Sequence, residues 1–397
     1  MRIGIDASCW VNRRGFGRYT SELVRALLEV DEHNEYVLFM DAATARHAEE
    51  FPDERRARRV VVSTTAAATQ AASAEGSRSL RDLLAMRRAV ADWGDRLDVF
   101  YFPADYTYFP VRTPARVVVT KHDMTDRRVP ELLFPTVRSR LFWEAKIRLA
   151  MWRADLVFTV SETSRRDIMQ AFRLGPGRVR VVSDAVDPSF TPAPAGVERD
   201  RVLARCGFSA SDRLLLYVGG ISPHKNLDTL VRAFARWVRT PDADPRVRLA
   251  LIGDYEADVF HSSYPAIKDL VARESLEARV RFTGYLPDDD LRHFLSAADA
   301  LVMASFYEGF GLPALEAMAC GAPVIAADAG ALPEVVGDAG LLFDPRSVEA
   351  LADALGRVLG DDALRRDMSR RGLGRAAQFN WHASARAALA AFEELSP

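Results

Sequence analysis

The sequence predicts an α/β fold built from two Rossmann-like parallel-sheet domains. Three observations lead to this prediction. The chain has 397 residues, which is more than a single domain usually contains. Short apolar runs alternate with amphipathic helical stretches from end to end, and this alternation is typical of parallel sheets covered by helices on both faces. A stretch rich in proline and small residues at 187–196 interrupts the alternation and is the best candidate for a linker.

The linker divides the chain into an N-terminal domain at 1–190 and a C-terminal domain at 191–380, which we expect to face each other across a cleft. The tail, 381–397, is predicted to form a final helix and is a candidate to pack back on the N-terminal domain. In open parallel sheets, ligands bind at the carboxyl ends of the strands, so functional residues are expected in the loops that follow the apolar runs.

The elements of the first half are predicted from short runs of four to six residues and from one strongly periodic helix. The weakly patterned segment at 63–80 is interpreted as a mobile surface loop. The expected strands lie at 2–7, 36–40, 60–63, 99–102, 117–120, 156–160 and 179–182, and the helix lies at 17–30. In the second half, strands are expected at 213–218, 248–252, 280–283, 300–303 and 324–326, and helices at 227–239, 267–274, 291–297 and 313–319.

Charge and cysteine content narrow the class of protein. The formal net charge of −2 gives no indication of nucleic-acid binding. Residues 1–190 carry 30 basic and 26 acidic side chains, a balance of +4, and the remainder carries −6. This asymmetry fits either solvated arginine-rich helix faces or an N-terminal domain that contacts a membrane surface or an anionic acceptor. The isolated Cys9, Cys206 and Cys320 have no zinc-ligand spacing and predict free thiols in a reducing compartment.

The sequence shows no recognisable targeting signal. The N-terminus enters a strand pattern directly and lacks a basic start, an apolar run and a cleavage site. No apolar stretch approaches the roughly 18 residues that a membrane span requires. We therefore expect a cytoplasmic protein, with peripheral contact at the inner face of the membrane left open.

The segment EGFGLPALE, from Glu308 to Glu316, carries the strongest chemical signal. A strand is predicted to end near residue 303, a glycine-rich turn follows, and a helix starts with Pro313 at its first position and ends before Gly321. The exposed N–H groups of such a turn and the helix dipole favour an anion such as a diphosphate. Carboxylates on both sides of the turn can accept hydrogen bonds from sugar or ribose hydroxyls.

The loop YVGGISPHKN, which follows the strand at 213–218, brings glycines and a cation to the same end of the domain. Gly219 and Gly220 end the strand, Lys225 supplies the charge, and Asn226 is expected to cap the next helix. The chain has only four lysines, so the position of Lys225 is informative. A fixed ammonium stabilises the charge that develops on a departing diphosphate.

Two further strand ends lie in the N-terminal half. Gly15 and Gly17 open the first helix in the sequence GFGRY, where glycines let a loop approach a ligand closely, although the pattern is not a full dinucleotide fingerprint. His122 and Asp123 follow the strand at 117–120. A lone histidine is more often structural than catalytic, and the location at a strand end is what favours a functional role here.

These motifs together resemble those of the retaining glycosyltransferases of family 4, which have the GT-B fold. The two glutamates with seven residues between them, VRFTGYLPD at 280–288, LPEVVGDAG at 332–340 and the GFGRY loop all match the family's pattern. The match is close over most of the C-terminal half and sparser over the N-terminal half. Within the family, the chain looks most like a mannosyltransferase subgroup.

The resemblance implies a role for each matching position. It makes the C-terminal domain the donor domain and the N-terminal domain the acceptor side. Glu308 would contact the donor sugar, Glu316 the ribose, and His122 a hydroxyl of the transferred sugar. Lys225 would bind the diphosphate; the arginine that often precedes this lysine is replaced by His224, so Arg18 or another arginine would have to act as the second clamp. The remaining implied donor contacts come from the backbone or glycines of Gly15, Gly17, Gly219, Gly220, Tyr285, Leu286, Phe310, Gly311 and Leu312.

The implied reaction is transfer of a hexose from a nucleotide-diphosphate sugar to a hydroxyl, with retention and without a cofactor or an essential metal. GDP-mannose is favoured over a UDP-sugar by resemblance alone, and the acceptor is a glycan, a lipid-linked glycan or a small molecule. The acidic run at 288–290 is interpreted as helix capping and not as a metal site. Two alternatives stay open: a non-catalytic sugar-nucleotide-binding protein, and a phosphorylase of the same fold with lysine-bound pyridoxal phosphate.

Overall fold

The computed structural model describes residues 1–12, 15–47, 51, 56–65, 79–134, 136–255 and 262–395. The chain forms two compact units, and each has its own parallel sheet. Unit 1 consists of residues 1–124, 134–184 and 380–397, and unit 2 of residues 125–133 and 185–379. Most of the loop expected at 63–80 lies outside the described residues.

Unit 1 contains a seven-stranded sheet in the order β3-β2-β1-β4-β5-β6-β7. Every strand pair in it is parallel. The central strands are buried along nearly their whole length, as expected for a parallel sheet covered on both faces. The strands are β1 (Arg2–Asp6), β2 (Glu35–Asp41), β3 (Ala57–Val62), β4 (Val99–Phe102), β5 (Arg116–Thr120), β6 (Leu156–Thr159) and β7 (Val179–Val181).

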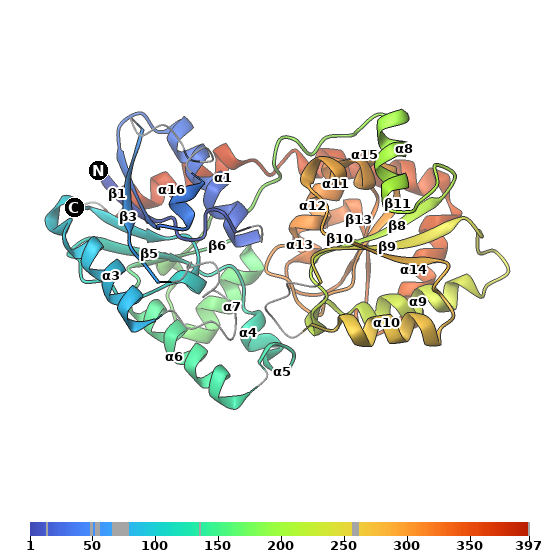
Figure 1. The fold of residues 1–397 in the computed structure, drawn as a ribbon, viewed down its shortest axis with the longest axis horizontal. Helices are drawn as coiled ribbons and strands as arrows, with labels where there is room; N and C mark the ends of the chain where they lie inside the picture. The colour runs from blue at the N-terminus through green and yellow to red at the C-terminus, as the bar shows by residue number, and fades with distance from the viewer. Residues whose placement is uncertain are drawn as a thin grey trace. The chain divides into compact units, whose positions relative to one another are not determined.

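Helices cover both faces of this sheet. The C-terminal helix α16 packs against α1, and both lie on one side of the sheet, while α3, α6 and α7 lie on the other (Figure 1). The helices of unit 1 are α1 (Gly15–Val30), α3 (Leu80–Ala91), α6 (Val137–Arg153), α7 (Glu162–Phe172) and α16 (Trp381–Glu393), with short 3-10 turns η1 (Thr44–Arg46), η3 (Gly94–Arg96), η4 (Asp105–Thr107) and η5 (Pro176–Arg178).

Unit 2 contains a six-stranded parallel sheet in the order β10-β9-β8-β11-β12-β13. Its strands are short apolar runs, and β12 is buried at all of its positions. The strands are β8 (Arg213–Val218), β9 (Val247–Ile252), β10 (Val280–Gly284), β11 (Ala298–Met303), β12 (Val324–Ala327) and β13 (Gly340–Phe343).

The helices of unit 2 also form two layers. One layer holds α9, α10 and α14, and the other holds α8, α11, α12 and α15 (Figure 1). The helices are α4 (Thr125–Arg128), α5 (Pro130–Leu133), α8 (Val197–Arg205), α9 (Leu227–Val238), α10 (Tyr264–Arg273), α11 (Asp288–Ala297), α12 (Leu312–Ala319), α13 (Leu332–Val336), α14 (Val348–Gly360) and α15 (Asp362–Ala376), with η6 (Pro223–Lys225) and η7 (Gly337–Ala339).

The predicted fold class is confirmed, including the return of the C-terminal helix to the first sheet. The prediction for the acidic run at 288–290 was wrong. The acidic run at 288–290 does not cap α11, because Pro287 occupies the N-cap position and makes no side-chain capping bond. The three carboxylates lie within the first turn instead, where they interact favourably with the positive end of the helix dipole.

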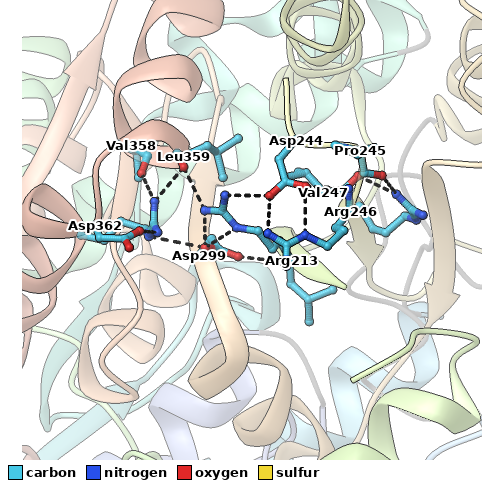
Figure 2. Close-up of polar contacts among 12 residues, drawn as sticks. Arg213, Asp244, Pro245, Arg246, Val247, Asp299, Val358, Leu359 and Asp362 are labelled. Carbon is cyan, nitrogen blue, oxygen red and sulfur yellow. Dashed lines mark hydrogen bonds and ion pairs between the residues drawn. The ribbon is translucent and has the colours of Figure 1, made fainter. Parts of the chain in front are cut away.

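A polar network ties the amino ends of the unit 2 strands to the helices behind them (Figure 2). Arg213, the first residue of β8, donates to Asp299 of β11 at 2.7 Å and to the carbonyl of Leu359 at 2.9 Å. It also forms an ion pair with Asp244 at 3.3 Å, in the loop before β9. Arg365 of α15 donates to the same Leu359 carbonyl and lies 3.4 Å from Asp299. The network joins three strand starts and two helices at the edge opposite the strand ends.

Candidate functional site

The strand order of unit 2 has one point at which the direction of winding reverses. The chain runs from β8 to β9 and β10 on one side, then returns to β11 on the other side of β8. The loops that follow β8 and β11 therefore leave adjacent carboxyl ends toward opposite faces of the sheet, and in open parallel sheets ligands bind at such a point. Both of the strongest sequence motifs lie in these two loops.

Lys225 and Glu308 meet at this switch point. Lys225 Nζ lies 2.7 Å from Glu308 Oε1, and the Ser305 hydroxyl donates to the same oxygen at 2.6 Å. Burial alone would raise the pKa of Glu308, but the Lys225 ammonium and these two hydrogen bonds lower it below the ordinary value. Glu308 is thus held as a carboxylate. Because an ammonium has three N–H groups, Lys225 can serve Glu308 and a phosphate at the same time.

His224 joins the two loops but carries no charge at neutral pH. Its backbone carbonyl accepts a hydrogen bond from the Phe306 N–H at 2.9 Å. Burial and the neighbouring Lys225 ammonium lower the pKa of the His224 ring to about 3. Its Nδ1 has no hydrogen-bond partner among the described residues. His224 therefore does not replace, as a cation, the arginine that is often found in this loop.

Asn226 has a different task from the predicted cap. It occupies the N-cap position of α9 in a left-handed conformation, and its side chain makes no capping bond. Its Nδ2 instead donates to the carbonyls of Ala304 and Pro345, at 3.0 and 2.8 Å. Asn226 thereby fixes the end of η6, and with it Lys225, to the strand end that leads to Glu308.

The backbone around Glu308 is held by close contacts that only glycine permits. Gly330 has φ +57°, and a Cβ there would lie 2.5 Å from the Glu308 carbonyl oxygen. Ala331 N–H donates to that same oxygen at 2.9 Å. Gly311, at φ +106°, precedes α12, and a Cβ there would lie 2.6 Å from a methyl group of Leu332. The turn therefore packs tightly against the segment at 330–332.

The other predicted residues of this motif lie at or near the start of α12. Leu312 begins the helix, so its N–H points out of the N-terminal end, where the dipole favours an anion. Phe310 is buried and packs edge-to-face on Phe379 with ring centroids 5.5 Å apart. Glu316 is a buried carboxylate in the second turn of α12. A buried carboxylate in a helix otherwise lined by Ala, Leu and Met indicates a specific role.

The loop after β8 approaches the loop after β9 very closely. Gly219 has φ +146°, and a Cβ on Gly253 would lie 2.0 Å from the Gly219 carbonyl oxygen. The Tyr217 hydroxyl donates to the Gly220 carbonyl at 2.6 Å and secures the turn. Gly253 was not predicted from the sequence; its place directly after a strand is the signal that would have identified it. Tyr285 and Leu286 follow β10, the former exposed and the latter buried.

Unit 1 places the other predicted residues at its own strand ends. His122 follows β5, and its Nε2 lies 2.9 Å from the carbonyl oxygen of Pro103, which follows β4. Burial lowers the pKa of His122, so the ring is neutral at pH 7. A carbonyl only accepts, so Nε2 carries the proton and Nδ1 the lone pair. The Tyr19 ring of α1 packs edge-on against the His122 ring, with centroids 4.8 Å apart.

A buried ion pair lies beside His122. Lys121 Nζ is 3.1 Å from Asp105 Oδ2, and both side chains are only 2% exposed. The pair joins the loops after β4 and β5, and it stabilises the position of the histidine between them. The sequence analysis predicted no role for Lys121. The signal was present, because a lysine directly after an apolar strand must find a buried partner or leave the core.

The glycines of the GFGRY loop differ in their constraints. A Cβ on Gly17 would lie 2.0 Å from the Asn12 carbonyl oxygen, so this position excludes any other residue unless the loop moves. A Cβ on Gly15 would meet nothing within 4 Å. Gly17 therefore lets α1 begin against the loop that follows β1. Gly15, Gly17 and His122 belong to unit 1, and Lys225, Glu308 and Glu316 belong to unit 2.

Among the described residues, no group of three or more His, Cys, Asp or Glu side chains has the arrangement of a metal site. Over that same part of the chain, no helix is both long enough and apolar enough to cross a membrane. None of the three cysteines, all of which lie among the described residues, forms a disulfide; Cys9 and Cys320 are buried, and Cys206 is half-buried.

Comparison with known proteins identifies the family of this site. The family model described as Glycosyl transferases group 1 matches residues 199–375, and the one described as Glycosyltransferase Family 4 matches residues 13–190. The chain is 33% identical over 377 residues to the O-antigen chain mannosyltransferase B of Escherichia coli, and the alignment covers 92% of each protein. The chain belongs to glycosyltransferase family 4.

Other similarities extend over one part of the chain or over the fold alone. The chain is 37% identical over 238 residues to a D-inositol 3-phosphate glycosyltransferase of Frankia alni, and the alignment covers 59% of this chain and 57% of the Frankia protein. Among solved structures, sucrose-phosphate synthase from Thermosynechococcus elongatus superposes with a TM-score of 0.74 at 22% identity, covering 100% and 99% of the two chains. Anabaena HepE in complex with UDP and glucose gives 0.73 at 20% identity, covering 98% of each. At these identities the superpositions establish the GT-B fold.

Proposed function

We propose that this glycosyltransferase is a retaining, metal-independent hexosyltransferase that moves mannose from GDP-mannose to a hydroxyl of a glycan or lipid-linked acceptor. The observation that carries the proposal is the Lys225–Glu308 pair at the winding reversal of the unit 2 sheet. It sets a cation for a diphosphate beside a carboxylate for sugar hydroxyls, next to the amino end of α12. The name of the Escherichia coli relative supports mannose as the sugar and a growing polysaccharide as the acceptor.

The transfer step breaks the bond between the anomeric carbon and the diphosphate oxygen. Lys225 and the first N–H groups of α12 stabilise the negative charge that develops on that oxygen. The acceptor hydroxyl attacks the oxocarbenium-like carbon from the face that the diphosphate leaves, and its proton passes to the departing phosphate oxygen. The products are the glycoside and the nucleoside diphosphate, and no enzyme nucleophile takes part.

Each predicted site residue has a task in this proposal. Glu308 accepts hydrogen bonds from the sugar, Glu316 from the ribose, and His122 Nδ1 from a hydroxyl of the transferred hexose. Backbone groups at Tyr285 and Leu286 contact the base. The glycine turns provide the remaining donor contacts, at Gly15, Gly17, Gly219, Gly220, Phe310, Gly311 and Leu312.

The donor is tested by a thermal-shift panel of GDP, UDP, ADP and their hexose conjugates, with and without EDTA. A ligand that binds the folded protein raises its apparent stability by about 2.7 kcal/mol at a hundredfold excess over Kd. We expect a shift with GDP and GDP-mannose that EDTA does not change. A shift confined to UDP-sugars would replace the donor, and a shift abolished by EDTA would overturn metal independence.

Turnover separates the enzyme from its alternatives. Release of GDP from GDP-mannose in the presence of a mannan acceptor, with an α-linked product by NMR, would establish retention because the donor itself is α-linked. Nucleotide binding without turnover on any glycan would favour a non-catalytic binding protein. Absorbance from a lysine-bound pyridoxal phosphate would favour the phosphorylase alternative.

We also propose a cytoplasmic location at the inner face of the membrane.

A further inference from the structure

Helix α6 of unit 1 presents apolar side chains to solvent. Twelve large apolar side chains are exposed among the described residues, and five of them lie on this single helix. Trp152 is 79% exposed and Phe142 71% exposed. Such a concentration on one helix differs from the scattered exposed apolar residues that are normal on protein surfaces. The five are Val137, Leu141, Phe142, Leu149 and Trp152.

The packing of α6 fixes which face points outward. Ile147, Ala150 and Met151 are buried against unit 1. Lys146 Nζ donates to the Tyr106 carbonyl at 2.6 Å, and Arg153 donates to the Thr113 carbonyl. At about 100° per residue, Leu141, Phe142, Leu149 and Trp152 fall within one third of the helix circumference, opposite the buried residues. A rotation of α6 that buried these four side chains would therefore expose Ile147, Ala150 and Met151 instead.

The same helix is strongly basic. It has five basic residues and one acidic residue, Glu144, for a net charge of +4. Arg138 and Arg140 are exposed in the first turn, next to Leu141 and Phe142. Arg148 is 66% exposed and pairs with Glu144 at 2.7 Å, close in the helix to Leu149 and Trp152. The five are Arg138, Arg140, Lys146, Arg148 and Arg153.

We propose that the outward face of α6 docks on an anionic lipid bilayer. Apolar and aromatic side chains on one face, flanked by arginines, are the features of a helix that lies in the plane of the membrane interface. A protein partner would match the apolar stripe, but Arg138 and Arg140, which are exposed in the first turn of the same helix, favour an extended anionic surface. This inference deepens the membrane location proposed above by naming the surface that makes the contact. Figure 1 shows α6 at the surface of unit 1.

The experiment is co-sedimentation of the full chain with phospholipid vesicles in the absence of donor. We expect binding to vesicles of about one-third phosphatidylglycerol in phosphatidylcholine, and at least about tenfold weaker binding to phosphatidylcholine alone or in high salt. The double variant F142E/W152E and the double variant R138E/R140E should each lose binding about tenfold or more. Val197→Glu is the matched control, because Val197 is 86% exposed on α8 of unit 2.

Three results would overturn the proposal: no sedimentation of the wild type with anionic vesicles, equal sedimentation of F142E/W152E, or an equal loss in the Val197 control. Circular dichroism establishes folding, and if F142E/W152E does not fold, the arginine variant decides the question alone. The nucleotide thermal shift is measured on the same samples. A variant that keeps the nucleotide shift and loses vesicles separates this surface from the transfer site.

Discussion

Lys225 and Glu308 are 83 residues apart in the chain, yet Lys225 Nζ lies 2.7 Å from Glu308 Oε1. Two neighbouring strand ends bring them together, and each loop is fixed by its own device. Asn226 bonds the lysine loop to the carbonyls of Ala304 and Pro345, and Gly330 allows the backbone behind Glu308 to approach. The pair is therefore positioned before any donor binds.

The first prediction concerns the charge of Lys225. Lys225→Met removes the ammonium but keeps most of the length of the side chain. If this ammonium stabilises the departing diphosphate, kcat should fall about 10²–10³-fold, as for other preorganised charge stabilisers. Lys268→Met is the control, because Lys268 is exposed on α10. A Lys225→Met enzyme with unchanged kcat and a raised KM would restrict the lysine to ground-state binding.

His224 gives a prediction for stability against pH. The folded-state pKa is about 3 and the ordinary value is 6.5, so between these values the unfolded chain binds a proton that the folded chain does not. The free energy of unfolding should therefore decrease as pH falls below 6.5, and His224→Gln should remove that part of the decrease. At pH 5 the two proteins should differ by about 1–2 kcal/mol relative to their difference at pH 7. Parallel urea curves at the two pH values would contradict this.

His122 is tested by two amides that replace different ring nitrogens. Asn presents an oxygen where Nδ1 stands, and Gln presents an N–H where Nε2 donates to Pro103. If Nδ1 accepts a hydrogen bond from the sugar, His122→Gln should lower kcat/KM about tenfold, and His122→Asn should lower it less. The opposite order would mean that the bond to Pro103, and hence loop structure, is what matters. Circular dichroism and melting temperatures of both variants provide the control for folding.

The sequence predicted the sheets well because buried parallel strands are continuous apolar runs, and the ends of those runs located Gly219, Lys225, His122 and Glu308. It could not predict side-chain partners between distant loops. An asparagine directly before a helix is a typical N-cap residue, so the sequence predicted a cap at Asn226. The structure shows that its amide donates instead to the carbonyls of Ala304 and Pro345, which are distant in the sequence. Ser305 was missed for the same reason, since a serine after a strand is common. The Lys121–Asp105 pair depends on the adjacency of β4 and β5.

Gly330 tests whether the backbone position of Glu308 limits catalysis. In Gly330→Ala the new methyl group would lie 2.5 Å from the Glu308 carbonyl oxygen and 2.7 Å from its nitrogen, so the backbone must shift. A displacement of this kind should lower kcat about tenfold or more and destabilise the fold by about 1–3 kcal/mol. Gly374→Ala in α15 is the control, since a methyl group there meets nothing within 4 Å. The control should keep full kcat and gain up to about 1 kcal/mol of stability.

The last prediction separates stability from function at the two edges of the unit 2 sheet. Arg213 lies at the amino end of β8, whereas Gly219 and Lys225 follow its carboxyl end. Arg213→Met leaves Asp299 and Asp244 without their shared guanidinium and the Leu359 carbonyl without this donor (Figure 2).

The Arg213 side chain is 20% exposed, so solvent reduces the loss, and we expect about 1–3 kcal/mol of destabilisation. Arg246→Met, which removes a more exposed ion pair to the same Asp244, should have a smaller effect. The Kd for nucleotide, measured by calorimetry well below the melting temperature, should stay within about twofold of wild type because the strand ends are intact. A large rise in Kd for Arg213→Met with unchanged stability would show that the network acts on the site, and not only on the sheet beneath it.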